Sequence, residues 1–208
     1  MDSEILETKN GYTVRIEQDQ DAQSPSEYQY EGAFLVAWHS DFYVRPPGDK
    51  SRRTDPQGDI DQFKKTHHIF LIEAYIHSGV RIAFASEGNF CDRRWDVSNP
   101  VGFIALAKDE WKTRSKKAEK YARALIETWN QYLSGDVWGY VVEKDGEHVD
   151  SCWGFFGREY AETEARAALN SAFEAAREEI EASKGPDLPG LVTAARAIGK
   201  LEIVHIEN

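Results

Sequence analysis

The sequence predicts a single α+β domain over residues 1–208, in which a mostly antiparallel or mixed sheet packs against two long helices. Three observations support this fold class. Hydrophobic residues make up 41% of the 208, which is enough for a sizeable core. Short apolar runs separated by turn residues are typical of antiparallel strands. Two longer segments repeat their apolar residues at the spacing of a helix.

The first half of the chain contains most of the expected strands. Alternating or continuous apolar runs predict strands at residues 12–16, 33–39, 68–75, 80–84 and 101–107. The third and fourth of these runs are separated by His77-Ser78-Gly79, which predicts a turn. A long polar loop is expected at about residues 44–62, because prolines, glycines and mixed charges are concentrated there. Such a loop is either a plain connection or an arm that binds a partner.

Both long helices are expected in the second half. Apolar residues recur at helical spacing from Asp109 onward, and Ser134-Gly135 predicts the end of the first helix. Asp145-Gly146 lies between two apolar runs and predicts a β-hairpin. A second helix is expected at about residues 158–182. Its buried stripe would consist of Ala165, Leu169, Phe173, Ala176 and Ile180. A short helix at about 191–198 and a strand at 201–206 complete the expected elements.

The net charge of −11 is distributed unevenly along the chain. Residues 1–62 have a net charge of −7, residues 63–125 of +5 and residues 126–208 of −9. A mostly acidic surface repels nucleic acid, so we expect no direct nucleic-acid binding. The basic middle third is either an ordinary hydrated surface or a place where a partner binds.

The sequence also bears on location and cysteine chemistry. No apolar run approaches the roughly 20 residues of a membrane-spanning helix, and residues 1–14 lack the basic start and apolar core of a signal peptide. We therefore expect a cytoplasmic protein, in the host cell cytosol, without membrane association. Cys91 and Cys152 should then be thiols rather than a disulfide, and Cys152 should be buried in its aromatic segment.

Common motifs for cofactors and metals are missing from the sequence. The two cysteines and six histidines do not form the paired spacings of zinc sites. The glycine-rich motifs for phosphate or dinucleotide binding and the serine-nucleophile motif are also missing. We therefore predict neither a metal nor a cofactor, and an enzyme is the less favoured interpretation.

Residues 88–103, GNFCDRRWDVSNPVGF, form the most unusual segment of the chain. A weak catalytic hypothesis combines Cys91 or Cys152 as the thiol, His77 as the base and Asp92 or Asp96 to orient it. The alternative is a loop in which neighbouring charges pair with each other. In that interpretation Trp95 anchors the loop in the core, and Arg93 and Arg94, with Asp92, are available for binding.

Four sequence blocks resemble a family of uncharacterised proteins from bacteriophage and mobile-element genomes. The blocks are YIHSG (75–79), FCDRRWD with VGFI (90–96 and 101–104), YLSGDVWGYVVE (132–143) and DSCWGFFG (150–157). The resemblance covers about residues 75–157. It departs from the family pattern at Asp92-Arg93-Arg94, which is a charged insertion before Trp95. The resemblance implies a phage or plasmid context and suggests, by analogy, an accessory protein that binds a host or defence-system protein.

We therefore expect an accessory protein that acts by protein binding. Acidic residues of the second helix, including Glu174 and Glu178, would occupy the basic groove of a host defence nuclease or another nucleic-acid-binding enzyme. One alternative is a small enzyme acting on a nucleotide or phosphate-bearing substrate, which Arg93 and Arg94 would hold. Another is a structural or assembly protein with exposed aromatic residues. The sequence indicates no oligomeric state.

Overall fold

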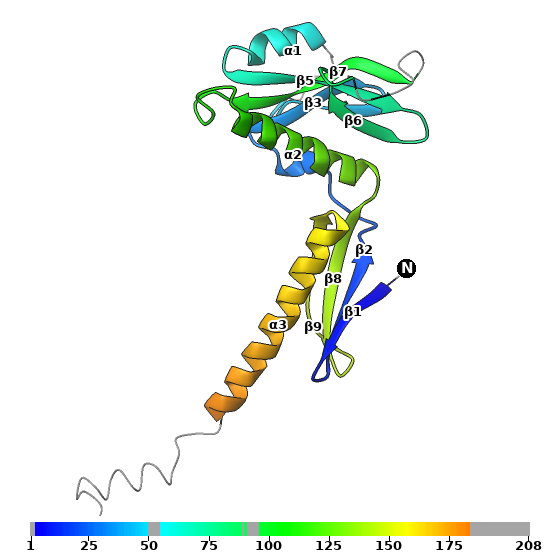
Figure 1. The fold of residues 1–208 in the computed structure, drawn as a ribbon, viewed down its shortest axis with the longest axis vertical. Coiled ribbons are helices and arrows are strands. Elements are labelled where there is room, and N and C mark those ends of the chain that lie inside the picture. Colours follow the sequence, from blue (N-terminus) through cyan, green and yellow to red (C-terminus); the bar gives the residue numbers. More distant parts are fainter. Residues whose placement is uncertain (1–2, 50–54, 89, 91–95, 184–208) are drawn as a thin grey trace, which may run out of the picture.

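The chain forms two antiparallel sheets, each covered by its own long helix (Figure 1). The computed structural model describes residues 3–49, 55–88, 90 and 96–183, and the statements below concern these residues. One sheet has five strands in the order β4-β3-β7-β5-β6, and the other has four in the order β1-β2-β8-β9. The α+β class and the antiparallel pairing are confirmed. The expectation of one sheet covered by two long helices is wrong, because each long helix packs on a different sheet.

The five-stranded unit consists of one sheet between two helices. Its elements are β3 (Ala33–His39), β4 (Phe42–Val44), α1 (Pro56–Phe63), β5 (His67–Ile76), β6 (Val80–Phe84), β7 (Val97–Ala107) and α2 (Lys116–Leu133). On one sheet face, α2 buries Ala118, Ala122, Ile126 and Trp129. On the other face, Ile60 and Phe63 of α1 pack against buried Phe34 and Phe103. This sheet is therefore covered on both sides, which explains the continuous apolar run of β3.

The four-stranded unit consists of a sheet with a helix on one face. Its elements are β1 (Ser3–Lys9), β2 (Tyr12–Gln18), β8 (Val137–Lys144), β9 (Glu147–Phe156) and α3 (Arg158–Ser183). Val14, Tyr140 and Val142 of the sheet pack against Ala165 and Leu169 of α3. Side chains alternate along a strand, so the intervening residues of β2 and β8 lie on the face away from α3.

The five-stranded unit is inserted between the two halves of the four-stranded unit. The chain leaves the four-stranded unit after β2 and crosses through residues 19–32, which include a short 3-10 helix, Pro25–Tyr28. It returns at the end of α2, where Gly135 adopts a φ of 74° and Asp136 N–H donates to Gln131 O at 2.8 Å. The expected helix end at Ser134-Gly135 is confirmed. Both connections therefore lie together at the junction of the two units (Figure 1).

Two tight turns close the hairpins of the four-stranded sheet. Asp145 and Gly146 have φ values of 51° and 87°, as two-residue hairpin loops require, and this hairpin was predicted. Asn10 and Gly11 have φ values of 52° and 82° and join β1 to β2. The β1 strand was not predicted.

Several expected boundaries need correction. The long polar loop at 44–62 is partly a helix, because Asp55 caps α1 by accepting a hydrogen bond from Gly58 N–H at 3.0 Å, and Pro56 occupies the first turn. The first long helix does not begin at Asp109 but at Lys116, after Ser115, whose Oγ accepts a hydrogen bond from Ala118 N–H at 3.3 Å. β7 begins at Val97 rather than at residue 101.

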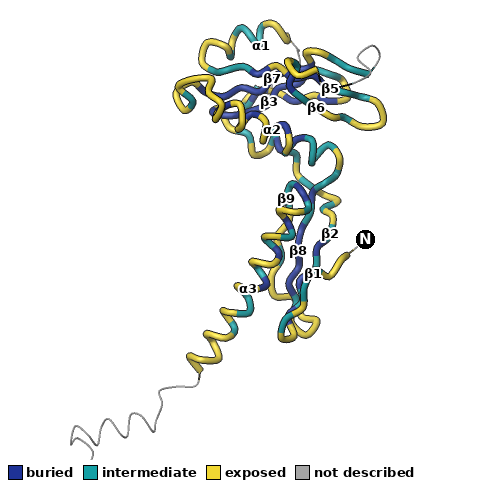
Figure 2. Tube along the Cα trace, in the orientation of Figure 1, coloured by how far each residue is buried: buried dark blue, intermediate teal, exposed yellow. Residues whose placement is uncertain are grey.

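The last part of α3 extends beyond its sheet. Residues 177–183 are exposed, as the lower end of the helix in Figure 2 shows. Ile180 is 57% exposed, so its expected place in the buried stripe is wrong. The predicted helix at 191–198 and strand at 201–206 lie outside the described residues. No helix in the described part of the chain is long and apolar enough to cross a membrane.

Candidate functional site

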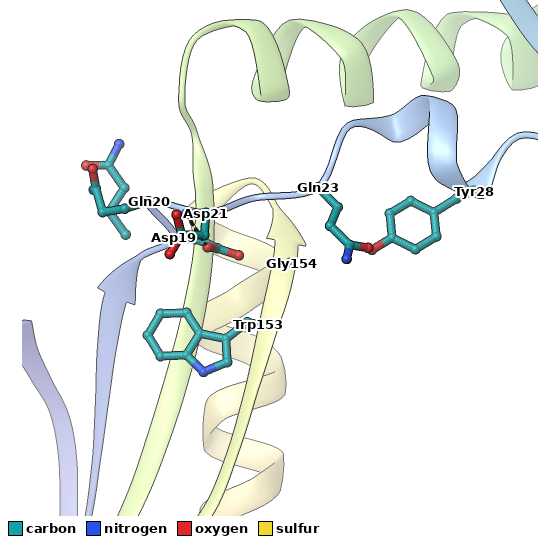
Figure 3. A pocket seen from close by; sticks show the side chains of 8 residues that line it. Asp19, Gln20, Asp21, Gln23, Tyr28, Trp153 and Gly154 are labelled. Carbon is teal, nitrogen blue, oxygen red and sulfur yellow. Dashed lines mark hydrogen bonds between the residues drawn. The ribbon is translucent and has the colours of Figure 1, made fainter.

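A cavity of about 500 Å³ lies at the junction of the two units. Residues of the connection from β2 to β3 form one side of it, and the end of β9 forms the other (Figure 3). Its lining consists of Gln18, Asp19, Gln20, Asp21, Gln23, Tyr28, Trp153 and Gly154. Aromatic and acidic side chains thus line the same cavity.

Gly139 and Gly154 allow the indole of Trp153 to lie against the sheet. A β-carbon placed on Gly139 would be 2.2 Å from Trp153 Cε3 and 2.4 Å from Cδ2, so the indole packs directly on the glycine backbone. The register of β8 and β9 shifts between Trp138 and Tyr140, and Gly154 has a φ of 84° at this bulge. A bulge of this kind redirects a neighbouring side chain.

Gly139 occupies a strand position where glycine is intrinsically unfavourable. Glycine inside a strand costs about 0.5–1 kcal/mol relative to alanine, yet Gly139 lies within β8 and is buried. The large apolar side chain that it accommodates is still 45% exposed. An interior glycine often marks a close approach of this type. The Trp153 indole is therefore held on the sheet surface, on the face away from α3, and it is accessible from the cavity.

Backbone contacts hold the opposite wall of the cavity in place. Asp19 N–H donates to Val137 O at 2.8 Å, which continues the ladder between β2 and β8 past the end of β2. Gln18 Nε2 donates to Gly135 O at 2.6 Å. Asp21 N–H donates to Asp19 Oδ1 at 3.0 Å, so the Asp19 carboxylate is held against the backbone of Asp21.

The outer part of this wall contains Tyr28. Its hydroxyl donates to Gln23 Oε1 at 2.9 Å, shown as a dashed line in Figure 3. Tyr28 is 62% exposed and ends the short 3-10 helix, which Ser24 caps. The cavity thus contains two aromatic rings, two carboxylates and several amide groups. No lysine or arginine of the described residues lines it. These groups suit a cation that can stack on an aromatic ring.

The surface around the cavity is also negatively charged. Residues 3–18 and 136–183, which form the four-stranded unit, contain 15 acidic and 6 basic residues, a net charge of −9. The connection at 19–32 adds four acidic residues and no basic one. The described residues between 33 and 135 contain 12 acidic and 11 basic residues, a net charge of −1. The negative charge is thus concentrated on the four-stranded unit and at the junction.

An arginine, a tryptophan and two carboxylates already interact elsewhere in this unit. Arg158 lies over the ring of Trp138, with its Cζ 5.2 Å from the ring centroid. Its Nη2 is 2.6 Å from Glu4 Oε2 and its Nε is 2.8 Å from Glu162 Oε1. The hydrogen bonds to Glu162 and Glu4 raise the pKa of Arg158, and the bond to Arg158 lowers the pKa of Glu162.

Other hollows, on the five-stranded unit, have a different character. The one beside β5 and β6 includes Arg114, whose guanidinium lies 4.4 Å from the centroid of the Phe70 ring. The one between β6 and α2 includes Arg123, which is 2.6 Å from Glu87 Oε1. In both, a cationic group of the chain already lies against an aromatic ring or a carboxylate.

Two of the predicted catalytic residues lie close together. His77 Nδ1 is 3.7 Å from Asp96 Oδ1, at the end of the β5–β6 hairpin, and Asp96 O accepts a hydrogen bond from Ile76 N–H at 2.8 Å. The side chain of His77 is 66% exposed. Cys91, the thiol of the hypothesis, lies outside the described residues.

The structure describes only some of the other predicted residues. Asp92, Arg93, Arg94 and Trp95, the predicted binding residues of the loop, also lie outside the described residues. Glu174 and Glu178 are exposed on α3, and Glu174 Oε2 is 3.1 Å from Arg177 Nη1. Cys152 was expected to be buried but is exposed, because β9 is an edge strand of its sheet. Within the described ranges, no three His, Cys, Asp or Glu side chains are grouped so that they could hold a metal ion.

The residues that line this cavity carry no motif that the sequence alone reveals. Asp19 and Asp21 fall in a polar stretch without periodicity, which predicts only a loop. The available signal was Gly139, a glycine inside the apolar strand of a predicted hairpin, which often marks a close approach. Comparison of the chain with models of known protein families, with curated proteins and with solved structures finds no match.

Proposed function

We propose that the protein is an accessory protein that acts by binding another protein through the acidic surface of its four-stranded unit. The observation that carries the proposal is the separation of charge, −9 on this unit against −1 on the described part of the five-stranded region. A concentrated field of one sign increases the rate and selectivity of association with an oppositely charged surface. The partner would therefore present a basic surface.

The shape of this unit supports a partner with a groove. The end of α3, residues 177–183, projects beyond the sheet and is exposed all around, and it includes Glu178 (Figures 1 and 2). Glu174 lies one turn earlier, on the exposed side of the helix. A helix of 26 residues is about 39 Å long at 1.5 Å per residue. A projecting acidic rod of this kind is complementary to the basic groove of a nucleic-acid-binding enzyme.

The basic middle third of the sequence does not oppose this interpretation. The described residues between 63 and 125 contain 10 basic and 6 acidic residues, a net charge of +4, and they belong to the five-stranded unit. Charges on different parts of a surface are screened beyond about 8–10 Å at physiological ionic strength. The acidic surface of α3 can therefore interact with a partner with little influence from the basic residues.

The proposed partner is a host defence nuclease, or another host enzyme that binds nucleic acid. The resemblance of four sequence blocks to proteins of phage and mobile elements supports this choice, since such elements gain from blocking defence enzymes. The protein would then inhibit by occupying the nucleic-acid groove.

Affinity capture from a bacterial lysate, followed by measurements on the purified partner, tests the proposal. We expect the captured protein to bind nucleic acid, DNA to compete with the accessory protein, and affinity to fall at least about tenfold between about 50 and 300 mM NaCl. The Glu174→Lys/Glu178→Lys variant should bind more weakly. The matched control Lys116→Glu/Lys117→Glu, on α2, changes the charge by the same amount in the opposite direction on the other unit, and it should not bind more weakly. An affinity independent of salt, or a partner without a basic surface, would contradict the proposal.

A further inference from the structure

We infer that the cavity beside Trp153 binds the guanidinium group of an arginine side chain. This inference rests on the proposed function, because the arginine would belong to the basic partner. The proposed function requires only an acidic surface, whereas this inference names one cavity and the chemical group that it binds.

The ring of Trp153 accounts for the affinity for a planar cation. One side of the indole packs on Gly139 of β8, and the side chain remains 45% exposed. A cation over the face of tryptophan is attracted by the negative charge of the ring face, and arginine also stacks on the ring because its guanidinium is planar. The glycine fixes the height of the ring above the sheet, so the stacking surface exists before the ligand arrives.

Asp19 and Asp21 provide the charge and the hydrogen-bond acceptors. Both line the cavity, and the hydrogen bond from Asp21 N–H to Asp19 Oδ1 keeps them in one turn. A carboxylate accepts two parallel hydrogen bonds from a guanidinium, a geometry that a lysine ammonium cannot match. Glutamine side chains also line the cavity, and an amide carbonyl can accept a hydrogen bond from a guanidinium N–H.

The chain's own Arg158 shows that this combination of groups holds an arginine. Trp138 supports the guanidinium from one side, and Glu4 and Glu162 bind it at 2.6 and 2.8 Å. The cavity is lined by the same kinds of group, a tryptophan and two carboxylates, and no arginine is present among the described residues that line it. A partner can supply the cation.

Calorimetric titration with capped tripeptides tests the inference directly. The probe is acetyl-Gly-Arg-Gly-amide. Two comparison peptides replace its arginine, one with citrulline, which is uncharged but nearly the same shape, and the other with lysine. We expect a Kd for the arginine peptide of about 1 mM, at least about tenfold weaker binding of citrulline and clearly weaker binding of lysine. Equal binding of the arginine and citrulline peptides would overturn the inference.

Variants separate the cavity from the general charge. Asp19→Asn/Asp21→Asn should weaken binding of the arginine peptide at least about tenfold, whereas Glu174→Gln/Glu178→Gln, which removes the same charge from α3, should change it less than about twofold. Gly139→Ala keeps every lining side chain but displaces the indole, and it should also weaken binding. If both double variants weaken binding equally, only long-range attraction is present and the inference fails.

The two proposals can fail separately. If the glutamates of α3 control capture of a basic partner but the arginine peptide does not bind at the cavity, the proposed function stands and the site is wrong. If the peptide binds as expected but the captured partner is indifferent to the charge of α3, the cavity stands and the acidic-surface mechanism is wrong. Thermal melting of each variant confirms that it is folded.

Discussion

Asn130, near the end of α2, binds both backbone groups of a residue on the neighbouring edge strand. Ile82 N–H donates to Asn130 Oδ1 at 2.8 Å, and Asn130 Nδ2 donates to Ile82 O at 3.0 Å. β6 is an edge of the five-stranded sheet, so the side-chain amide occupies the place of a further strand. The contact attaches α2 to the sheet and covers two edge groups at once.

We predict that Asn130→Ala lowers the free energy of unfolding by about 2 kcal/mol. Each of the two hydrogen bonds contributes about 1 kcal/mol net, and the Ile82 groups lose their partner in a half-buried place, which adds a desolvation cost. The higher helix propensity of alanine offsets about 0.5 kcal/mol of the loss. Urea denaturation measures the difference, and an unchanged slope shows that the same surface unfolds.

Asn170→Ala is the matched control for this prediction. Asn170 is also inside a long helix, but it is exposed and its side chain accepts a single hydrogen bond, from Lys9 Nζ at 3.2 Å. The gain in helix propensity is the same, so the unfolding free energy should stay within about 0.5 kcal/mol of the natural protein. If Asn130→Ala is as stable as Asn170→Ala, the paired hydrogen bonds do not hold α2 on the sheet.

Three further predictions concern stability. Gly102→Ala should lower the unfolding free energy by at least about 3 kcal/mol in urea denaturation. The new β-carbon would be 2.0 Å from Val36 O, a backbone atom that cannot rotate away. A neutral effect would show that the strands separate easily. Leu169→Ala should cost about 2–5 kcal/mol by thermal melting, since Leu169 of α3 is completely buried against the sheet, and a loss below about 1 kcal/mol would mean that the helix packs loosely. Because the hydrogen bond to Arg158 lowers the pKa of Glu162, stability from this contact is present above the unfolded pKa of about 4.3 and is lost as pH falls through the folded pKa. Glu162→Gln should flatten the acid side of the stability profile, and an unchanged profile would contradict the assignment.

Local turn and helix chemistry could be predicted from the sequence. Asp145-Gly146 marks the β8–β9 hairpin, and the helical periodicity identifies α2 and α3. The β1–β2 hairpin has the same type of signal at Asn10-Gly11, but β1 is an edge strand whose residues are half-buried or exposed, so its apolar pattern is weak. Asp55-Pro56 also indicates the start of a helix inside the predicted loop.

The division into two sheets could not be predicted in this way. An apolar pattern shows that one face of a strand is buried but does not show which helix or strand buries it. β2 pairs with β8, more than 100 residues later, and the whole five-stranded unit lies between them. Two similar amphipathic helices are compatible with one sheet or with two.

The candidate site depends on features that the sequence pattern does not contain. A regular two-residue hairpin would place Gly139 opposite Cys152. Register shifts after Val142 and after Trp138 place it instead opposite the Trp153-Gly154 bulge. A shift of one residue moves every following side chain to the other face. The contact between Gly139 and Trp153 therefore follows from the bulges, and the position of Asp19 follows from its hydrogen bond to Val137 O.

The indole N–H resonances of the natural protein provide the most direct test of the cavity. With Trp153 assigned through Trp153→Phe, the arginine tripeptide is titrated while the indole signals are recorded by NMR. We expect the Trp153 signal to shift in a saturable way and the Trp138 signal, whose ring is already in contact with Arg158, to stay in place. A Trp153 signal that stays in place at a saturating peptide concentration, or equal shifts of both signals, would contradict this expectation.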